Sequence, residues 1–245
     1  MADTIVGQYS PTDEVFRFTD FTNTIADSFT NVQQGEIGGV GVGTGENLRT
    51  TDWNTDLCVE WVGFSSTVNS SFTAAGGHGL TGSGSESADN FQSSGFNADT
   101  LHRYTGFTST ILGSFTPTAI GDLEGSTVDG SDNSVIVADT TPFTVNQQTG
   151  FTNTVLATFD IGGSAGRHWG VGITPAGNPM APAANGANVD IHKFTGFTPT
   201  VSAQFSTSIS LSPGGVEDFD YAGRFAAAGP SFSLTIRRGQ GIQLL

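Results

Sequence analysis

A short aromatic motif recurs five times along the chain and constrains its fold more than any other feature. In most copies an aromatic residue is followed by two residues, a second aromatic residue and a Thr-rich segment that ends in Phe. The second aromatic residue, the marker phenylalanine, is Phe21, Phe64, Phe107, Phe151 and Phe197, at spacings of 43, 43, 44 and 46 residues. A period this regular indicates repeated units that pack against their neighbours.

Each copy has the pattern of a β-hairpin. Gly precedes the marker phenylalanine in four copies and Asp20 in the first, and Asn, Ser or Pro follows two positions later, all residues that favour turns. In the fourth copy, Val155, Ala157 and Phe159 share one face of the second strand, which is expected to pack on a neighbouring sheet. The hairpins are predicted near residues 15–30, 58–73, 101–116, 145–160 and 190–206.

About 30 residues separate consecutive hairpins and hold one or two further candidate strands, such as Ile37–Val42 and Ser134–Ala138. Four strands in roughly 43 residues are the content of one blade of a β-propeller. We therefore predict an all-β fold, a five-bladed β-propeller that forms a single domain over residues 1–245. An open solenoid of the same repeats and a sixth, degenerate blade within residues 207–245 are the alternatives.

The two ends of the sequence favour a closed ring. Only one candidate strand, residues 4–9, precedes the first hairpin, whereas about 40 residues follow the last and include candidate strands at 219–225 and 231–237. We predict that a closing segment at residues 216–240 completes the first blade, so that N- and C-terminal strands share one sheet. Such a closure removes the exposed ends that a solenoid would have to cap.

Residues 189–197, followed by Thr200, Val201 and Phe205, resemble the repeat of NHL-like β-propeller proteins. Five blades of this size also resemble the tachylectin type of sugar-binding propeller. The first resemblance implies an architecture only. The second implies carbohydrate binding, although the sugar contacts of that family cannot be assigned to residues of this chain.

The charge balance is strongly acidic. The chain has 23 acidic and 8 basic residues, a formal net charge of −15, and Lys193 is its only lysine. Nucleic acid is not an expected partner, because no basic patch can neutralise phosphates. In roughly 1 M salt the Debye length falls to about 3 Å and screens the self-repulsion. The composition therefore resembles that of proteins from extreme halophiles, and an acidic mesophilic surface protein is the alternative.

The sequence also predicts where the protein is made. Cys58, the single cysteine, excludes an internal disulfide and lies in an apolar run typical of a core. The first residues lack the basic and apolar regions of a secretory signal, and no run of about 18 apolar residues could span a membrane. We expect synthesis in the host cytoplasm and no membrane insertion.

Few residues of the sequence suggest a catalytic or metal-binding role. His78 and His168 lie near Gly-rich segments at a similar phase of the repeat and could form the catalytic pair of a propeller lyase; surface or interface histidines are the alternative. Neither a nucleophile elbow nor a phosphate loop is supported. The acidic segments lack the spacing of an EF-hand loop. We therefore predict no catalytic residue, no metal ligand and no cofactor, and leave open an unassigned structural cation.

Two tryptophans complete the candidate site. Trp53 and Trp169 lie outside the hairpins and could stack on a sugar, whereas Trp61 occupies a repeat position and is expected in the core. The candidate ligand-binding residues are Trp53, Trp169, His78 and His168.

Together these features predict a non-enzymatic virion protein of a halophilic archaeal virus, in a tail fibre, spike or capsid decoration. It would form a homo-oligomer, assemble with other virion proteins and contact host surface glycans or proteins. The alternatives are a free carbohydrate-binding propeller lectin and a propeller lyase or hydrolase.

Overall fold

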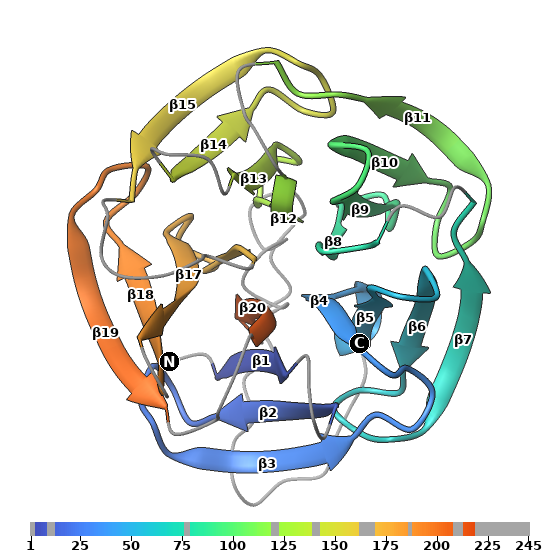
Figure 1. Cartoon of the computed structure of the whole chain (residues 1–245), viewed down its shortest axis with the longest axis horizontal. Helices are drawn as coiled ribbons and strands as arrows, with labels where there is room; N and C mark the ends of the chain where they lie inside the picture. Colours follow the sequence, from blue (N-terminus) through green and yellow to red (C-terminus); the bar gives the residue numbers. More distant parts are fainter. Residues whose placement is uncertain are drawn as a thin grey trace, which may run out of the picture.

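The computed structural model describes residues 3–8, 13–75, 79–118, 123–138, 143–161, 170–185, 188–207 and 213–218. These residues form five antiparallel sheets of four strands, arranged around a common centre (Figure 1). The predicted five-bladed β-propeller is therefore confirmed. Within the described ranges, a short 3-10 turn at Thr44–Glu46 is the one helical element, and no helix there is long and apolar enough to cross a membrane.

Each blade is one sheet, and we number the blades in chain order. Blade 1 consists of β20 (Pro213–Asp218), β1 (Thr4–Gln8), β2 (Glu14–Phe18) and β3 (Ile25–Thr30). Blade 2 consists of β4 (Ile37–Val42), β5 (Leu48–Asp52), β6 (Leu57–Trp61) and β7 (Val68–Thr73). Blade 3 consists of β8 (Gly84–Ser85), β9 (Phe91–Gly95), β10 (Thr100–Tyr104) and β11 (Ile111–Phe115).

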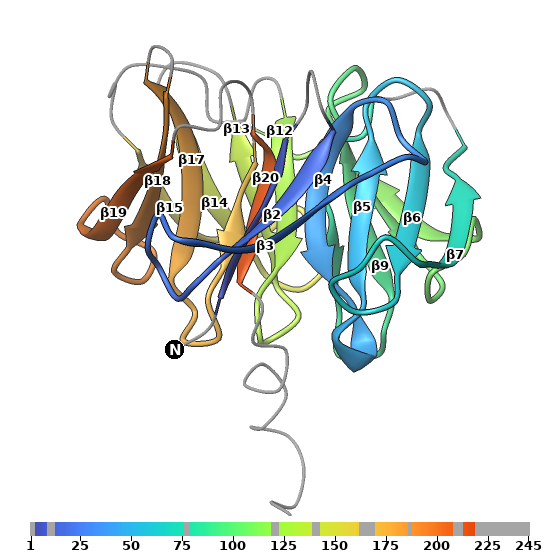
Figure 2. The same ribbon diagram turned by 90° about the horizontal axis from the view of Figure 1, so that it is seen from below.

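Blade 4 consists of β12 (Leu123–Val128), β13 (Ser134–Ala138), β14 (Thr144–Gln148) and β15 (Val155–Asp160). Blade 5 consists of β16 (Gly172–Ile173), β17 (Pro179–Asn185), β18 (Asn188–Phe194) and β19 (Val201–Thr207). Each blade is given from its innermost to its outermost strand, and the strands run between the two ends of the propeller (Figure 2). Each repeat hairpin thus supplies the two outer strands of a blade.

Blade 1 is closed by both ends of the described chain, as predicted. β20 pairs antiparallel with β1, with Asp218 opposite Thr4 and Val216 opposite Val6. The closing strand begins at Pro213, earlier than the predicted segment 216–240, because proline is tolerated at the first residue of an edge strand, and β20 is the innermost strand of its sheet. The candidate strands at 219–225 and 231–237 lie outside the described residues.

The repeat motif forms the same turn in every blade. In the first turn the Thr19 backbone N–H donates to the Thr24 carbonyl at 2.8 Å, and the equivalent bond in the other four turns is 2.8 or 2.9 Å long. The residue before each marker phenylalanine has a positive φ, 53° at Asp20 and 54° or 55° at the four glycines. Glycine adopts this left-handed conformation freely, and Asp is among the few other residues that adopt it.

Aromatic contacts join each blade to the next. The Phe near the end of one outer strand lies edge-on against the marker phenylalanine of the following blade. The ring-centroid distances are 5.2 Å for Phe29 and Phe64, 5.0 Å for Phe72 and Phe107, 4.8 Å for Phe115 and Phe151, 6.4 Å for Phe159 and Phe197, and 4.9 Å for Phe205 and Phe21. The five hairpins are therefore linked into a ring by one repeated contact.

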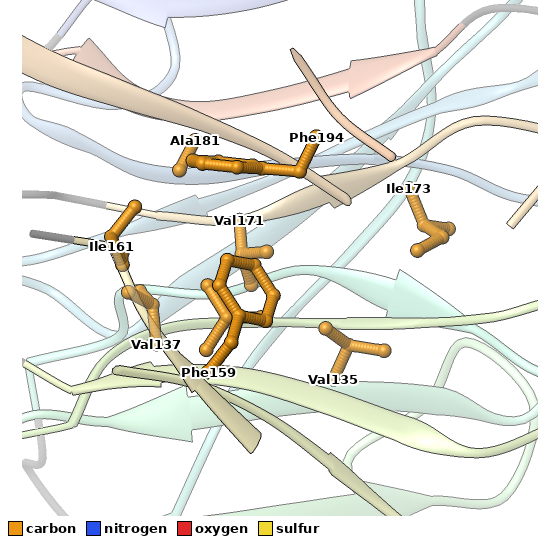
Figure 3. Packing of buried hydrophobic residues seen from close by; sticks show 9 residues of the cluster. Val135, Val137, Phe159, Ile161, Val171, Ile173, Ala181 and Phe194 are labelled. Atoms are coloured by element: carbon orange, nitrogen blue, oxygen red, sulfur yellow. The ribbon is translucent and has the colours of Figure 1, made fainter. Parts of the chain in front are cut away.

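The apolar core is divided among the joints between blades. Figure 3 shows the cluster between blades 4 and 5, where Phe159 packs on Phe194 with ring centroids 5.0 Å apart. The predicted apolar face of β15 holds only near the end of the strand. Phe159 is buried against blade 5, whereas Val155, the first residue of this outermost strand, is 46% exposed. Cys58 and Trp61 are fully buried, as predicted.

Some glycines of the inner strands lie so close to neighbouring backbone that no side chain would fit there. A Cβ atom on Gly38 would lie 1.8 Å from the Leu80 carbonyl oxygen, and one on Gly125 would lie 2.4 Å from the Gly170 Cα atom. Both distances are far below any allowed contact. The Gly-rich segments between hairpins therefore build the tightly packed centre of the ring.

Candidate functional site

Trp53 lies at the joint between blades 2 and 3, at the end of the propeller opposite the repeat turns. It follows β5 directly, and its backbone N–H donates to the Glu36 carbonyl at 2.9 Å. Its half-buried side chain packs against Phe96 with ring centroids 4.7 Å apart. Asn97, next in the chain, is exposed. An aromatic ring with an amide beside it is suited to a small polar ligand such as a sugar.

The other three predicted site residues, His78, His168 and Trp169, lie outside the described residues. Gly79, which follows His78 in the sequence, is described, and a Cβ atom placed there would lie 3.5 Å from the Trp53 ring. Its backbone N–H donates to Asp56 Oδ1 at 2.9 Å. The structure thus places the chain that follows His78 beside Trp53, and it places neither His78 nor His168 relative to the other.

The remaining two histidines are buried, and each lies beside an aromatic residue of its own strand. His102 in β10 and His192 in β18 are both buried, with ring centroids 6.2 Å from Tyr104 and 6.3 Å from Phe194. Burial lowers the pKa of His192, and the carboxylate of Asp190 opposes that shift. The two histidines stand in different blades and serve as interior residues.

Three carboxylates meet near the joint of blades 1 and 2. The buried Asp52 accepts backbone hydrogen bonds from Gly35 at 2.9 Å and from Thr55 at 2.6 Å. Burial raises the pKa of Asp13, and the charges of Asp52 and Glu36 raise it further. One carboxylate oxygen each of Asp13 and Glu36 is shielded from solvent without a hydrogen bond. Even so, no group of three His, Cys, Asp or Glu residues within the described ranges could hold a metal ion.

Sequence reasoning missed three buried hydroxyls, those of Thr51 in blade 2 and of Ser93 and Tyr104 in blade 3. Thr51, Ser93 and Tyr104 are wholly buried, and their hydroxyl oxygens lie away from solvent. Burial raises the pKa of Tyr104 to about 12, and the neighbouring Ser93 hydroxyl partly opposes this rise. Tyr104 occupies a repeat position that predicts core, and nothing in the sequence marks Thr51 or Ser93.

The basic residues of the described chain all lie over marker phenylalanines at blade joints. Their cationic groups and the ring centroids are 5.0 Å apart for Arg17 and Phe64, 4.9 Å for Arg49 and Phe107, 5.9 Å for Arg103 and Phe151, and 4.6 Å for Lys193 and Phe21. Such cation–π contacts contribute about 0.5–2 kcal/mol each, depending on exposure. The cations of this part of the chain thus hold the ring together.

In blade 2 the cation at the joint comes from a different strand than in blades 1, 3 and 5. Arg17, Arg103 and Lys193 occupy the same position of the repeat, where blade 2 has Glu60. Arg49 of β5 takes over the cationic role: its Nη2 atom lies 2.7 Å from Glu60 Oε2 and 2.8 Å from Asp89 Oδ1, and its side chain is almost fully buried. A cation is therefore supplied to the joint from a different strand.

Comparisons with solved structures identify the fold. A glutaminyl cyclase from Myxococcus xanthus is similar over 70% of this chain and 71% of its own, with 10% identity and a TM-score of 0.57. A chain of a nidogen–laminin complex is similar over 89% and 98%, with 11% identity and a TM-score of 0.59. A Bacteroides caccae protein of unknown function is similar over 83% and 73%, with 9% identity and a TM-score of 0.50.

These identities are low enough that the similarity shows the propeller fold alone. No protein-family model matches the chain, and no curated protein matches it in sequence. The resemblance to NHL-like and tachylectin-type repeats therefore stays a prediction.

Proposed function

We propose that the chain is a non-enzymatic binding and assembly module, and specifically a virion structural or attachment protein of a halophilic archaeal virus. The observation that supports the halophilic part of this proposal is the distribution of charge. The four described cations are all engaged at blade joints, so the surface formed by the described residues is dominated by carboxylates. Such a surface suits an environment of high salt, where repulsion between charges is screened.

The proposed partners follow from the same surface. An acidic exterior repels nucleic acid, whose binding requires neutralised phosphates. Other virion proteins and a glycan or protein of the host surface are the partners of this module, and it acts as a homo-oligomer in the particle. Its synthesis takes place in the host cytoplasm, and assembly carries it to the virion.

The proposal is tested by locating the protein. Mass spectrometry of purified virus particles is compared with that of uninfected host cells. A fixed stoichiometry in particles supports the virion role and its assembly function. Finding the protein in uninfected cells and not in virus particles overturns the proposal.

A free carbohydrate-binding lectin is the second candidate, and Trp53 favours it. An isolated monomer would then bind glycans, and Trp53→Ala would abolish binding because the stacking ring is lost. Asn54→Ala, an exposed neighbour, is the matched control and leaves binding unchanged. The array is probed at about 1 M salt, where the repulsion between the carboxylates of the protein is screened. If the isolated protein binds no glycan there, the lectin candidate is excluded.

A further inference from the structure

Among the residues that the structure describes, no strand pairs with the outer edges of the five outermost strands, β3, β7, β11, β15 and β19, at the rim of the propeller (Figure 1). Their outward backbone groups are available to pair with a further strand. The first residue of each of these strands is an exposed aliphatic side chain: Ile25, Val68, Ile111, Val155 and Val201. In a chain this acidic, the five strands contain only two charged residues, Asp27 and Asp160.

The edge of β11 in blade 3 is the most suitable for pairing. It contains no charged residue, and its first two side chains, Ile111 and Leu112, are 42% and 53% exposed. Natural edge strands usually avoid pairing by placing charges, especially Lys, or Pro along the edge. β11 has neither. An edge strand of this kind is a binding surface for an extended peptide.

The sequence itself contains a segment with matching properties. Residues 231–237 alternate Phe232, Leu234 and Ile236 with small polar residues, a period-two pattern typical of a strand. Blade 1 is already completed by β20, so the closure of the ring does not require this candidate strand. Thr and Ile also favour extended structure.

Charge and length both suit this segment to the rim of another molecule. Residues 219–245 contain three Arg and one Asp, a net charge of +2, whereas residues 1–218 contain 5 basic and 22 acidic residues, a net charge of −17. Twelve residues separate Asp218 from Ser231, and an extended chain of that length reaches at most about 45 Å. A connection of this length allows residues 231–238 to lie far from β20 and to contact another molecule.

We propose that residues 231–238 of one copy pair as an additional strand with the outer edge of β11 in a second copy. Backbone hydrogen bonds along the edge provide affinity, and contacts of the apolar side chains with Ile111 and Leu112 provide register. Arg237 and Arg238 then lie against the acidic body of the neighbouring copy, where contact distances are too short for salt to screen the attraction fully. This link between copies specifies the contact of the homo-oligomer proposed above, and it does not depend on the virion role.

The test compares the mass in solution of full-length variants, measured by light scattering after size-exclusion chromatography in about 1 M salt. The wild-type chain is expected to associate. Leu234→Asp combined with Ile236→Asp is expected to give a monomer, and so is Leu112→Glu on the acceptor edge. Leu156→Glu is the matched control, because Leu156 is 58% exposed at the same position of blade 4, and it keeps the wild-type mass.

Hydrogen exchange of the β11 amides locates the contact. The wild-type chain is expected to exchange at least about tenfold more slowly there than the Leu234/Ile236 variant, because paired amides are protected. A monomeric wild-type chain overturns the proposal, even if β11 is protected, since the segment would then pair within its own molecule. Equal effects of Leu112→Glu and Leu156→Glu also overturn it. Absence of the protein from virus particles contradicts only the virion role.

Discussion

The ring of Phe205 lies edge-on against Phe21, with centroids 4.9 Å apart and an interplanar angle of 79°. Phe205 belongs to the last blade and Phe21 to the turn of the first, so this contact completes the circle of five equivalent joints. The Lys193 ammonium group lies 4.6 Å from the centroid of the same Phe21 ring. The circle of blades is therefore closed at two places, by the pairing of β20 with β1 within blade 1 and by the aromatic contact between blades 5 and 1.

Phe205→Ala is expected to destabilise the protein by about 3 kcal/mol, because it removes a buried aromatic side chain and its edge-to-face partner. Urea unfolding followed by circular dichroism in high salt measures the loss. Val32→Ala is the control, since Val32 is 75% exposed, and is expected to change stability by less than about 0.5 kcal/mol. Equal effects of the two substitutions would show that the joint contributes nothing.

Arg49→Met is expected to cost about 3–5 kcal/mol, because it leaves the buried carboxylate of Glu60 without its cation. Adding Glu60→Met is expected to recover most of that loss, since the unpaired charge is then removed. Both values come from urea unfolding. Arg17→Met, at a half-exposed position, is expected to cost less than about 1 kcal/mol. A double variant no more stable than Arg49→Met contradicts the argument.

Gly106→Ala is expected to destabilise the protein by about 1–2 kcal/mol, because the residue has a φ of +54°. No atom lies within 4 Å of the position a Cβ would take, so the cost arises from backbone conformation alone. Gly106→Asp is expected to cost less, since Asp20 adopts the same conformation in blade 1. Thermal unfolding distinguishes the two, and the reverse order would refute a conformational cause.

The fold was predictable from the sequence because the repeat fixes both the content and the number of blades. The start of the closing strand was not, since Pro213, Gly214 and Gly215 are typical of a turn, and only the structure shows that Pro213 begins an edge strand, where proline is tolerated. The exposure of Val155 was missed for a related reason. A period-two pattern gives the faces of a strand, and it does not indicate that the strand is outermost.

The candidate site was predictable only in part. Trp53 stood out because it lies outside the repeat, and the structure gives it a half-buried place beside Phe96. The approach of Asp13 to Asp52 depends on how blades 1 and 2 are joined, and the meeting of Ser93 with Tyr104 depends on the pairing of β9 with β10. Both connect residues of ordinary type that lie apart in the sequence, so no local pattern reveals them.

Asp13→Asn is expected to stabilise the protein at pH 7. Burial and the charges of Asp52 and Glu36 raise the pKa of Asp13 in the folded state, so ionisation disfavours folding. The penalty is fully present above the folded pKa and disappears below the unfolded value of about 3.9. The advantage of the variant in urea unfolding should therefore shrink as the pH falls from 7 towards 4. Glu46→Gln, at an exposed position, is the control, and a pH-independent difference would contradict the cause given.

The acidity of the chain leads to a prediction about salt. Lowering the salt concentration from about 1 M to about 0.1 M lengthens the Debye length from about 3 Å to about 10 Å, so carboxylates on neighbouring blades begin to repel one another. The four cations at the joints cannot compensate, because each already lies over a phenylalanine ring. We therefore expect the urea midpoint, followed by circular dichroism, to fall steadily across this range. A midpoint independent of salt would remove the argument for a halophilic origin and leave the propeller as an ordinary acidic protein.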